Sequence, residues 1–484
     1  MSANIIGDLA NAAKALTAHR YGVITAGNNM ANVNNENYSR QRVVIGEDGV
    51  IQTLVGSQGT GVEVQGFEQM RDTVLDREIL RETSLNASLE AQQSALAKAE
   101  SSLGQEISRA DDSAFIDGST TDSASGGIAD TLNSFFTAFH SLSANPGSDA
   151  EKEALLQNAD LLTEKLNVTS ERFSDLHEDI GLEVSTDIDS ANQMIEEIAR
   201  LNTEISRAES QSAGQALSLR DQRQGILEDL SEIMQIKTEE IPDSSGQIRV
   251  YVPTVGADSP TINLVERGRY QEVKFIDAET EADSPKFVVG DDETQIEISN
   301  GSVAGALEAR DGVIAEYRRG LDALAEELVT QVNALYSDGN PPNDTNFFDD
   351  TDTSAAGIKL VDGLTAATLR TTNSDEQAQG DNSLTLAIAE LDETKLDALG
   401  GRDLGTFYRA VVTDLGEGVA KVEARLEDEA VVFDLLKQQQ DSVSGVSLDE
   451  EMTDMMKFQR AFQATGKLIS AIDEMLDVIV NRLV

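Results

Sequence analysis

Cysteine and tryptophan are absent from the 484 residues of this chain, and histidine occurs only three times. The absence of cysteine excludes disulfide bonds, thiolate metal sites and cysteine nucleophiles. Aromatic residues make up only 4% of the sequence, so we expect the cores to consist mainly of aliphatic side chains from helices. A chain of this length is ample for about two to four domains.

Catalytic motifs are missing as well. The sequence contains no G-x-S-x-G, H-E-x-x-H or P-loop pattern. The Gly-rich stretch that begins at Gly56 lacks the spacing of a phosphate loop, and no predicted helix follows it. The histidines lie far apart in predicted helices, which is more typical of packing or surface residues than of catalytic bases. They are His19, His140 and His177.

An acidic stretch contains Asp349, Asp350 and Asp352, which could attract Ca²⁺. The twelve-residue calcium loop, with its central Gly and terminal Glu, is not present, so a solvated loop is the simpler interpretation. We therefore expect a structural protein and not an enzyme, with no catalytic residue, metal site or cofactor.

Positive charge is scarce: 37 basic residues face 87 acidic ones, which gives a net charge of −50. Phosphate binding needs basic patches, so this balance argues against nucleic acid and anionic membranes as partners. No run of about 18 apolar residues occurs, so we expect no membrane insertion. The N-terminus, with Asp8 among polar residues, does not resemble a Sec-type signal peptide. A protein of this kind that works outside the cell would leave it by another route.

The charge is also unevenly distributed. Residues 1–40 carry a net charge of +1 and residues 445–484 carry −3, so −48 lies between them. Copies packed side by side cannot bring large like charges together without cost. Near-neutral ends on an acidic body therefore favour ends that are buried in an assembly and a body that faces solvent.

Apolar residues near the C-terminus return every seven positions, with a second row beside them, as in the a and d positions of a coiled coil. The first row is Leu448, Met455, Phe462, Ile469, Leu476 and Leu483, and the second is Phe458, Thr465, Ile472 and Ile479. Gly445 precedes this predicted helix, and Ser447 with Glu450 matches a capping box. Such a helix needs a partner, because its seam is too apolar to leave in water.

The N-terminal region has a similar pattern. Its rows are Leu9, Leu16, Val23 and Met30, with Ile5, Ala12, His19 and Ala26 beside them. The two terminal helices are predicted to pair, but heptads do not say whether the partner belongs to the same molecule or to another copy. The residues of all four rows, apart from Ala12, His19, Ala26 and Thr465, form the predicted assembly interface.

Helical periodicity dominates the middle of the chain. We expect helices over residues 4–34, 71–109, 128–142, 148–205, 219–236, 302–337 and 404–440, and a loop over 111–127. Short β-hairpins are predicted between residues 41 and 70, where glycines alternate with Val and Ile. At Lys237 the composition changes to proline-rich β-type runs, so residues 237–300 are predicted to form a small β domain.

The predicted fold class is mainly α with an inserted β domain. The molecule is expected to be elongated, with terminal helices in a coiled coil, a long helical bundle as its body and a small β-rich outer domain. Residues 1–40 with 441–484 would form the terminal assembly core. Residues 41–236 with 301–440 would form the helical body with its β-hairpins, and residues 237–300 the inserted β domain.

Two stretches resemble the signatures of the bacterial flagellar rod, hook and hook-associated proteins. The first is Asn28-Asn-Met-Ala-Asn-Val-Asn-Asn-Glu-Asn-Tyr-Ser-Arg-Gln, and the second is Ser444-Gly-Val-Ser-Leu-Asp-Glu-Glu-Met with Phe458-Gln-Arg-Ala-Phe-Gln-Ala. The signature positions are Asn28, Asn29, Asn32, Tyr38, Arg40, Gln41, Gly445, Leu448, Asp449, Glu450, Gln459 and Arg460. Asn37 stands where the family usually has Gly; since Asn tolerates a left-handed backbone, the turn is expected to survive.

The middle of the chain, with Leu219-Arg-Asp-Gln-Arg and residues 301–336, is most similar to the members that join the flagellar hook to the filament. This resemblance implies a structural subunit that leaves through the flagellar type III export channel, bound to an export chaperone. It further implies a ring of identical subunits between the hook protein and the second hook–filament junction protein, outside the cell.

Two other interpretations remain open. A hook or distal rod subunit of the same family should have a β-rich middle, whereas residues 71–236 are predicted to be helical. An intracellular coiled-coil adaptor, from a different class, would carry the same heptads.

Overall fold

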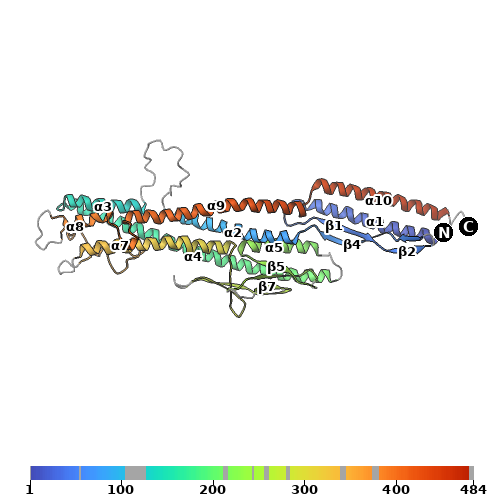
Figure 1. Cartoon of the computed structure of the whole chain (residues 1–484), viewed down its shortest axis with the longest axis horizontal. Coiled ribbons are helices and arrows are strands. Elements are labelled where there is room, and N and C mark those ends of the chain that lie inside the picture. The colour runs from blue at the N-terminus through green and yellow to red at the C-terminus, as the bar shows by residue number, and fades with distance from the viewer. Residues whose placement is uncertain are drawn as a thin grey trace, which may run out of the picture. The chain divides into compact units, whose positions relative to one another are not determined.

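A computed structural model describes residues 2–53, 56–103, 127–210, 216–242, 245–255, 261–278, 284–337, 345–372 and 381–478. Long helices make up most of the described chain and short antiparallel sheets much of the rest (Figure 1). The predicted class, mainly α with a smaller β part, is confirmed. The α-helices are α1 Ser2–Ala31, α2 Thr73–Ser102, α3 Ile128–Ala144, α4 Asp149–Glu209, α5 Leu217–Ile233, α6 Ser302–Glu308, α7 Ala315–Tyr336, α8 Ser383–Ala389, α9 Leu404–Ser444 and α10 Leu448–Asp477.

The strands form four small antiparallel sheets, with orders β1-β4, β2-β3, β5-β6-β7-β8 and β11-β10-β9. Their bounds are β1 Gln41–Glu47, β2 Val50–Thr53, β3 Gly56–Gly59, β4 Val62–Gln69, β5 Lys237–Glu240, β6 Ile248–Val252, β7 Ile262–Glu266, β8 Arg269–Tyr270, β9 Val273–Ile276, β10 Lys286–Val289 and β11 Thr294–Ile296. Strands β1–β4 lie in the region where hairpins were predicted, and β5–β11 in the region of the proline-rich β-type runs.

The chain divides into two compact units. The first unit consists of Met1–Ala87, Asp187–Gly301 and Asp428–Val484, and the second of Ser88–Thr186 and Ser302–Glu427. Both terminal helices and all of the sheets belong to the first unit.

In the first unit, α1 packs against α10, and strands β1 and β4 also contact α1 (Figure 1). Strand β1 pairs with β4 in a register that sets Gln41 opposite Gln69, with an irregularity between Val44 and Ile45. This pairing carries the chain away from α1 and towards the start of α2.

In the second unit, an aromatic cluster forms part of the core. Helix α3 supplies three fully buried phenylalanines, and the segment after α7 supplies two more, with ring centroids between 4.9 and 6.1 Å apart. These residues are Phe135, Phe136, Phe139, Phe347 and Phe348. The helix predicted over residues 302–337 is interrupted by a π-helical segment, η2 Ala309–Ile314, which the periodicity did not reveal.

Helices and strands are joined by a repeated device. In the described part of the chain, four helix asparagines each donate Nδ2–H to a carbonyl and accept, at Oδ1, the N–H of the same residue, with distances between 2.8 and 3.2 Å. The pairs are Asn29 with Gln41, Asn192 with Val273, Asn202 with Ile248, and Asn333 with Phe348. In the first three pairs the side-chain amide takes the place of a neighbouring strand, and in the fourth it binds the segment after α7. The polar backbone groups of these segments thus stay satisfied where they meet the helix.

The predicted helices are found close to their expected bounds. Helix α4 runs for 61 residues, and α3 ends at Ala144, next to the Asn-Pro-Gly that was expected to stop it. The predicted loop over residues 111–127 lies almost wholly outside the described residues.

Candidate functional site

The terminal helices pair within one molecule. Small residues of α1 are buried in the first unit: Ala12, Ala18, Gly22 and Ala26. At Gly22 the two helices approach closely, since a Cβ there would lie 2.5 Å from Cδ1 of Phe458. The partner that the heptads required is therefore present in the same chain.

The predicted interface residues are distributed around this contact. Four of those in α1 are half-buried: Leu9, Leu16, Val23 and Met30. In α10, Ile472 is buried, and four others are half-buried: Met455, Phe458, Ile469 and Leu476. Leu448 and Phe462 are exposed. Ile479 and Leu483 lie outside the described residues, and only the backbone of Ile5 is described.

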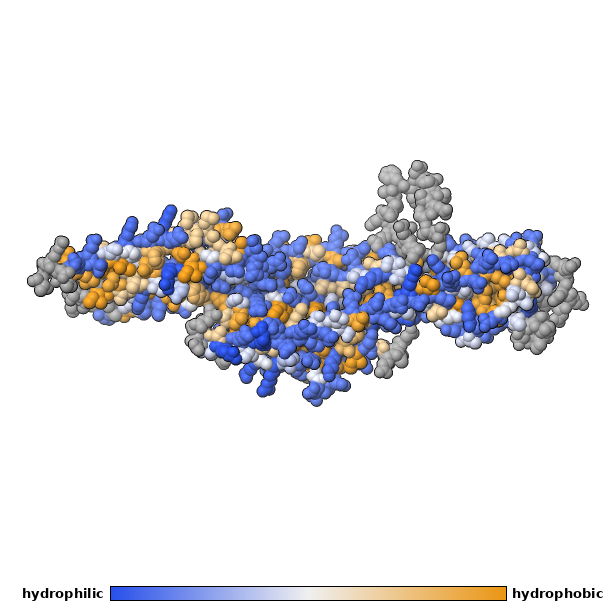
Figure 2. All heavy atoms as spheres, turned by 180° about the vertical axis from the view of Figure 1, so that it is seen from behind, coloured by the Kyte–Doolittle hydropathy of each residue, from blue (hydrophilic) through white to orange (hydrophobic). Residues whose placement is uncertain are grey.

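Further apolar side chains remain exposed on the outer faces of the terminal pair. They are Ile6 and Ile24 of α1 and Met452, Met456, Leu468 and Met475 of α10. In Figure 2, orange patches interrupt the hydrophilic surface in the terminal region, at the left of that view. The two helices thus cover part of each other's apolar face and still leave apolar side chains exposed. Such exposed apolar surface is typical of an interaction site.

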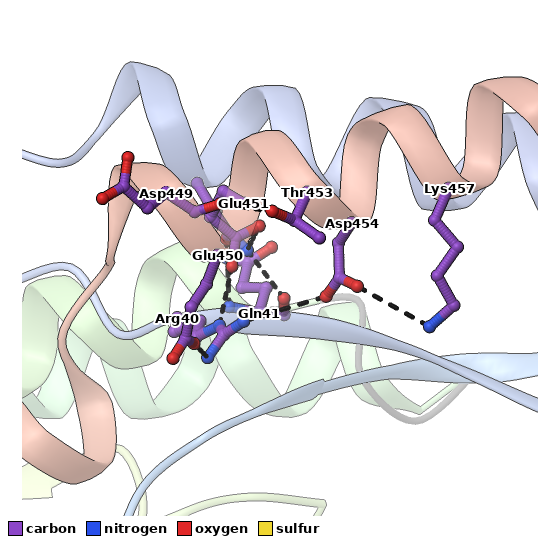
Figure 3. A network of polar contacts seen from close by, with 9 residues as sticks. Arg40, Gln41, Asp449, Glu450, Glu451, Thr453, Asp454 and Lys457 are labelled. Carbon is purple, nitrogen blue, oxygen red and sulfur yellow. Dashed lines mark hydrogen bonds and ion pairs between the residues drawn. The ribbon is translucent and has the colours of Figure 1, made fainter.

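Arg40 is held by carboxylates at the start of α10 (Figure 3). Its Nε donates to Oε1 of Glu451 at 2.7 Å, its NH1 donates to Oε2 of Glu450 at 2.7 Å, and Asp454 lies 3.9 Å from NH2. Burial acts to lower the pKa of Arg40, and the carboxylates of Glu451 and Glu450 outweigh it, so this pKa is raised. The N-terminal signature is therefore joined to the C-terminal one by charge-assisted hydrogen bonds.

Asn29 connects the same two signatures from the side of α1. It is buried, and besides its paired bonds to Gln41 it donates Nδ2–H to Oε2 of Glu451 at 2.9 Å. Tyr38 donates its hydroxyl to Oδ1 of Asn29 at 2.7 Å. Burial, with the charges of Asp221 and Glu451, raises the pKa of Tyr38 to about 12, so the phenol remains a donor.

A third segment meets this cluster. Asp221 of α5 accepts at Oδ1 from the N–H of Ser39 at 3.4 Å and from Nε2 of Gln69 at 2.8 Å. Burial raises the pKa of Asp221 to about 6. The backbone N–H of Arg40 donates to the carbonyl of Ser444 at 2.9 Å. We call the group Asn29, Tyr38, Arg40, Asp221 and Glu451 the signature cluster.

The remaining signature residues have simpler places. Asn32 donates Nδ2–H to the carbonyl of Asn28 at 2.9 Å, and Gly445 lies where a Cβ would be 2.3 Å from the Asp441 carbonyl. Asp449, Gln459 and Arg460 are exposed on α10. Sequence reasoning missed Asp221 and Glu451 as site residues, although both lie within the motifs that carried the resemblance.

The predicted capping box is wrong. Ser447 is the residue before α10, as expected, but its side chain makes no capping bond, and the Glu450 carboxylate is bound by Arg40. The turn at Asn37 survives, since the N–H of Tyr38 donates to the carbonyl of Asn35 at 3.0 Å. It needs no left-handed residue, because among described non-glycine residues positive φ occurs at Ser245, Arg267 and Glu293.

The other charged candidates serve local structure. Asp349 accepts from the N–H of Thr351 at 3.0 Å and pairs with Lys359 at 3.1 Å, and these bonds lower its pKa to about 2.

Among the described residues, no three acidic or histidine side chains gather closely enough to hold a metal ion. The described helices also include none with the length and apolarity to cross a membrane. His19 lies beside Phe458 in the terminal pair, with ring centroids 6.4 Å apart.

Comparisons with known proteins identify the same kind of protein as the two sequence signatures. Residues 114–348 match the family model described as "Flagellar hook-associated protein FlgK helical domain", and residues 437–483 match "Flagellar basal body rod FlgEFG protein C-terminal". The chain is therefore similar to the axial proteins of the bacterial flagellum, and among them to flagellar hook-associated protein 1.

Named relatives cover the chain almost completely. Flagellar hook-associated protein 1 of Bacillus subtilis (strain 168) is 25% identical, over 100% of this chain and 99% of the relative. The protein of that name from Escherichia coli (strain K12) is 20% identical, over 97% and 98%. The flagellar hook junction protein FlgK from Burkholderia pseudomallei has the same fold, with a TM-score of 0.61 at 13% identity, over 76% of this chain and 100% of that one.

Proposed function

We propose that this chain is a structural subunit of the bacterial flagellum that joins the hook to the filament. The observation that carries the proposal is the pair of terminal helices. Hydrogen bonds of the signature cluster join these two helices, which come from opposite ends of the chain, and the pair leaves apolar side chains exposed on its outer faces. The full-length likeness to hook-associated protein 1 supports the same role.

In this proposal the protein works outside the cell, at the hook–filament junction, as a ring of identical subunits. Its neighbours would be the hook protein and the second hook–filament junction protein, and an export chaperone would bind it before secretion. Residues 1–40 with 441–484 would be the assembly core, residues 41–236 with 301–440 the body, and residues 237–300 an outward β insertion. The role is mechanical and includes no catalysis.

The test is to place a charge on the outer face of α10. Phe462 is exposed, so Phe462→Asp should leave the chain folded while a carboxylate enters the contact between copies. We expect cells that make only this variant to grow hooks without filaments, as seen by electron microscopy of purified flagella. Leu182→Asp, a substitution of an exposed leucine on α4, is the matched control and should support filaments.

Two outcomes would contradict the proposal. Normal filament growth from the Phe462→Asp chain would remove the assembly role of α10. Purified flagella without the protein, with all of it inside the cell, would favour an intracellular adaptor.

A further inference from the structure

The last part of α9, residues 428–444, presents apolar side chains outwards. Val431 is 69% exposed, Val432 is 46% exposed and Leu435 is 64% exposed. Leu435 follows Val432 by three positions and Val431 by four, so it lies next to both of them on the helix surface. A surface helix normally turns its apolar stripe towards the core.

Polar groups, with the half-buried Phe433 and Leu436, attach the same segment to the first unit. Lys437 donates from Nζ to Oε2 of Glu228 on α5 at 3.0 Å. One side of the segment is thus held in the first unit, while Val431, Val432 and Leu435 stay exposed. Exposed apolar surface of this kind is typical of an interaction site.

The rim of this apolar face is acidic, since Asp428, Asp434 and Asp441 are all exposed. A partner surface should therefore combine apolar contact with positive charge. Such a surface is uncommon on a chain with a net charge of −50.

The chain nevertheless has one, at the start of α2. Val74 is 54% exposed, and the exposed Arg77 and Arg81 follow it at three and seven positions, so the three share one helix face. Arg77 donates from Nε to its own helix at the carbonyl of Thr73, and Arg81 pairs with the adjacent Glu82. Both side chains remain on the outside of the first unit.

We propose that the outer face of residues 428–444 docks the Val74–Arg77–Arg81 face of a second copy of this chain. The inference rests on the proposed function, which supplies neighbouring copies. The two faces differ, so the contact is heterologous: each copy would offer one face to the copy before it and the other to the copy after it, which generates a ring when the rotation closes.

The first test uses Leu435→Asp, with Leu182→Asp as a control of similar exposure on α4. Both variants should keep the wild-type circular dichroism spectrum and urea midpoint, because both side chains already face solvent. Self-association of the full chain, followed by analytical ultracentrifugation, should weaken at least about tenfold for Leu435→Asp alone, because the contact would bury a carboxylate. Unchanged association of Leu435→Asp would overturn the inference.

The second test identifies the partner and exploits the absence of cysteine. Leu435→Cys and Val74→Cys proteins are prepared separately, mixed and oxidised, so any disulfide between them joins two copies. This heterodimer should form faster than the one between Leu435→Cys and Leu182→Cys. Equal rates, or capture of a different flagellar protein by Leu435→Cys in assembled flagella, would overturn the inference.

The experiments distinguish a failure of the proposed α9 contact from a failure of the proposed function. If Leu435→Asp assembles normally and Phe462→Asp does not, the α9 contact is wrong and the proposed function stands. If Phe462→Asp also supports filaments, the proposed function is wrong whatever the cysteine experiment gives.

Discussion

Arg40 and Glu451 lie 411 positions apart in the sequence, yet Nε of the one donates to Oε1 of the other at 2.7 Å. Only 3% of the Glu451 side chain is exposed, so its charge depends on Arg40 and on the amide of Asn29 for compensation. The contact joins the segment after α1 to the first turn of α10. It therefore favours one position of α10 relative to the chain that follows α1.

We expect Arg40→Ala to loosen the terminal pair strongly. Removing one partner leaves a buried carboxylate without its main counter-charge, and we expect a loss of about 2–3 kcal/mol in the free energy of local opening. Hydrogen exchange of α1 and α10 would measure it. Arg42→Ala is the control, because Arg42 pairs with Glu68 at the surface, and this loss should stay below about 1 kcal/mol. Equal losses for the two variants would show that the buried pair of Arg40 and Glu451 stabilises the helices no more than a surface ion pair does.

Asn29→Asp should be worse than Asn29→Ala. The amide donates to the Gln41 carbonyl and to the Glu451 carboxylate, and a carboxylate at this position can donate to neither. It would also bring a second negative charge against Glu451. We expect Asp to cost at least about 1 kcal/mol more than Ala in hydrogen exchange of α1. Asn32→Ala, which removes a bond on the exposed side of the helix, should have little effect. A milder Asp variant would contradict this account.

Two glycines of α1 should respond in opposite directions. Gly22→Ala would place a methyl group 2.5 Å from the Phe458 ring, so we expect a loss of about 1–3 kcal/mol from overpacking. Gly27 has open space where a Cβ would stand, and Gly27→Ala should stabilise the helix by about 0.5–1 kcal/mol. Urea unfolding followed by hydrogen exchange would compare them. Combining Gly22→Ala with Phe458→Ala should recover part of the overpacking loss, and failure to do so would argue against close contact.

Asp221 should make stability fall as the pH rises. Burial raises its pKa to about 6, so between its unfolded pKa near 4 and pH 6 the folded chain holds the proton more tightly than the unfolded chain does. The contribution of this group is complete below about pH 4 and is lost as the pH rises through 6. Between pH 5 and 7.5 we expect the loss to be about 1 kcal/mol. Asp221→Asn should remove this part of the pH dependence.

The measurement for Asp221 is urea unfolding of wild type and variant across that range, which stays above the isoelectric point of about 4.2. Parallel pH profiles for the two proteins would mean that the carboxyl group titrates alike in the folded and unfolded chains.

The pairing of α1 with α10 could be predicted from sequence because heptad spacing is a property of each helix alone. Which residues would be deepest could not, since that depends on where the helices cross: the seam buries Glu451 and leaves Leu448 exposed. Glu450 fits a capping box by its spacing, but a guanidinium from a distant segment binds it more strongly than a backbone amide would. Asn192 and Asn202 look like any surface residues of α4 until the strands beside them are known.

The link between Asn29 and Glu451 spans 422 positions, and this separation has a consequence for synthesis. At about 5–20 residues per second, the ribosome delivers Glu451 roughly 20–80 s after Asn29. During that interval α1 lacks its partner helix α10, so the apolar face of α1 is available to any protein that binds the nascent chain. Until Glu451 has been made, the α1 end of the molecule therefore stays unpaired, and in that interval it can still be bound by another protein or threaded through a narrow channel.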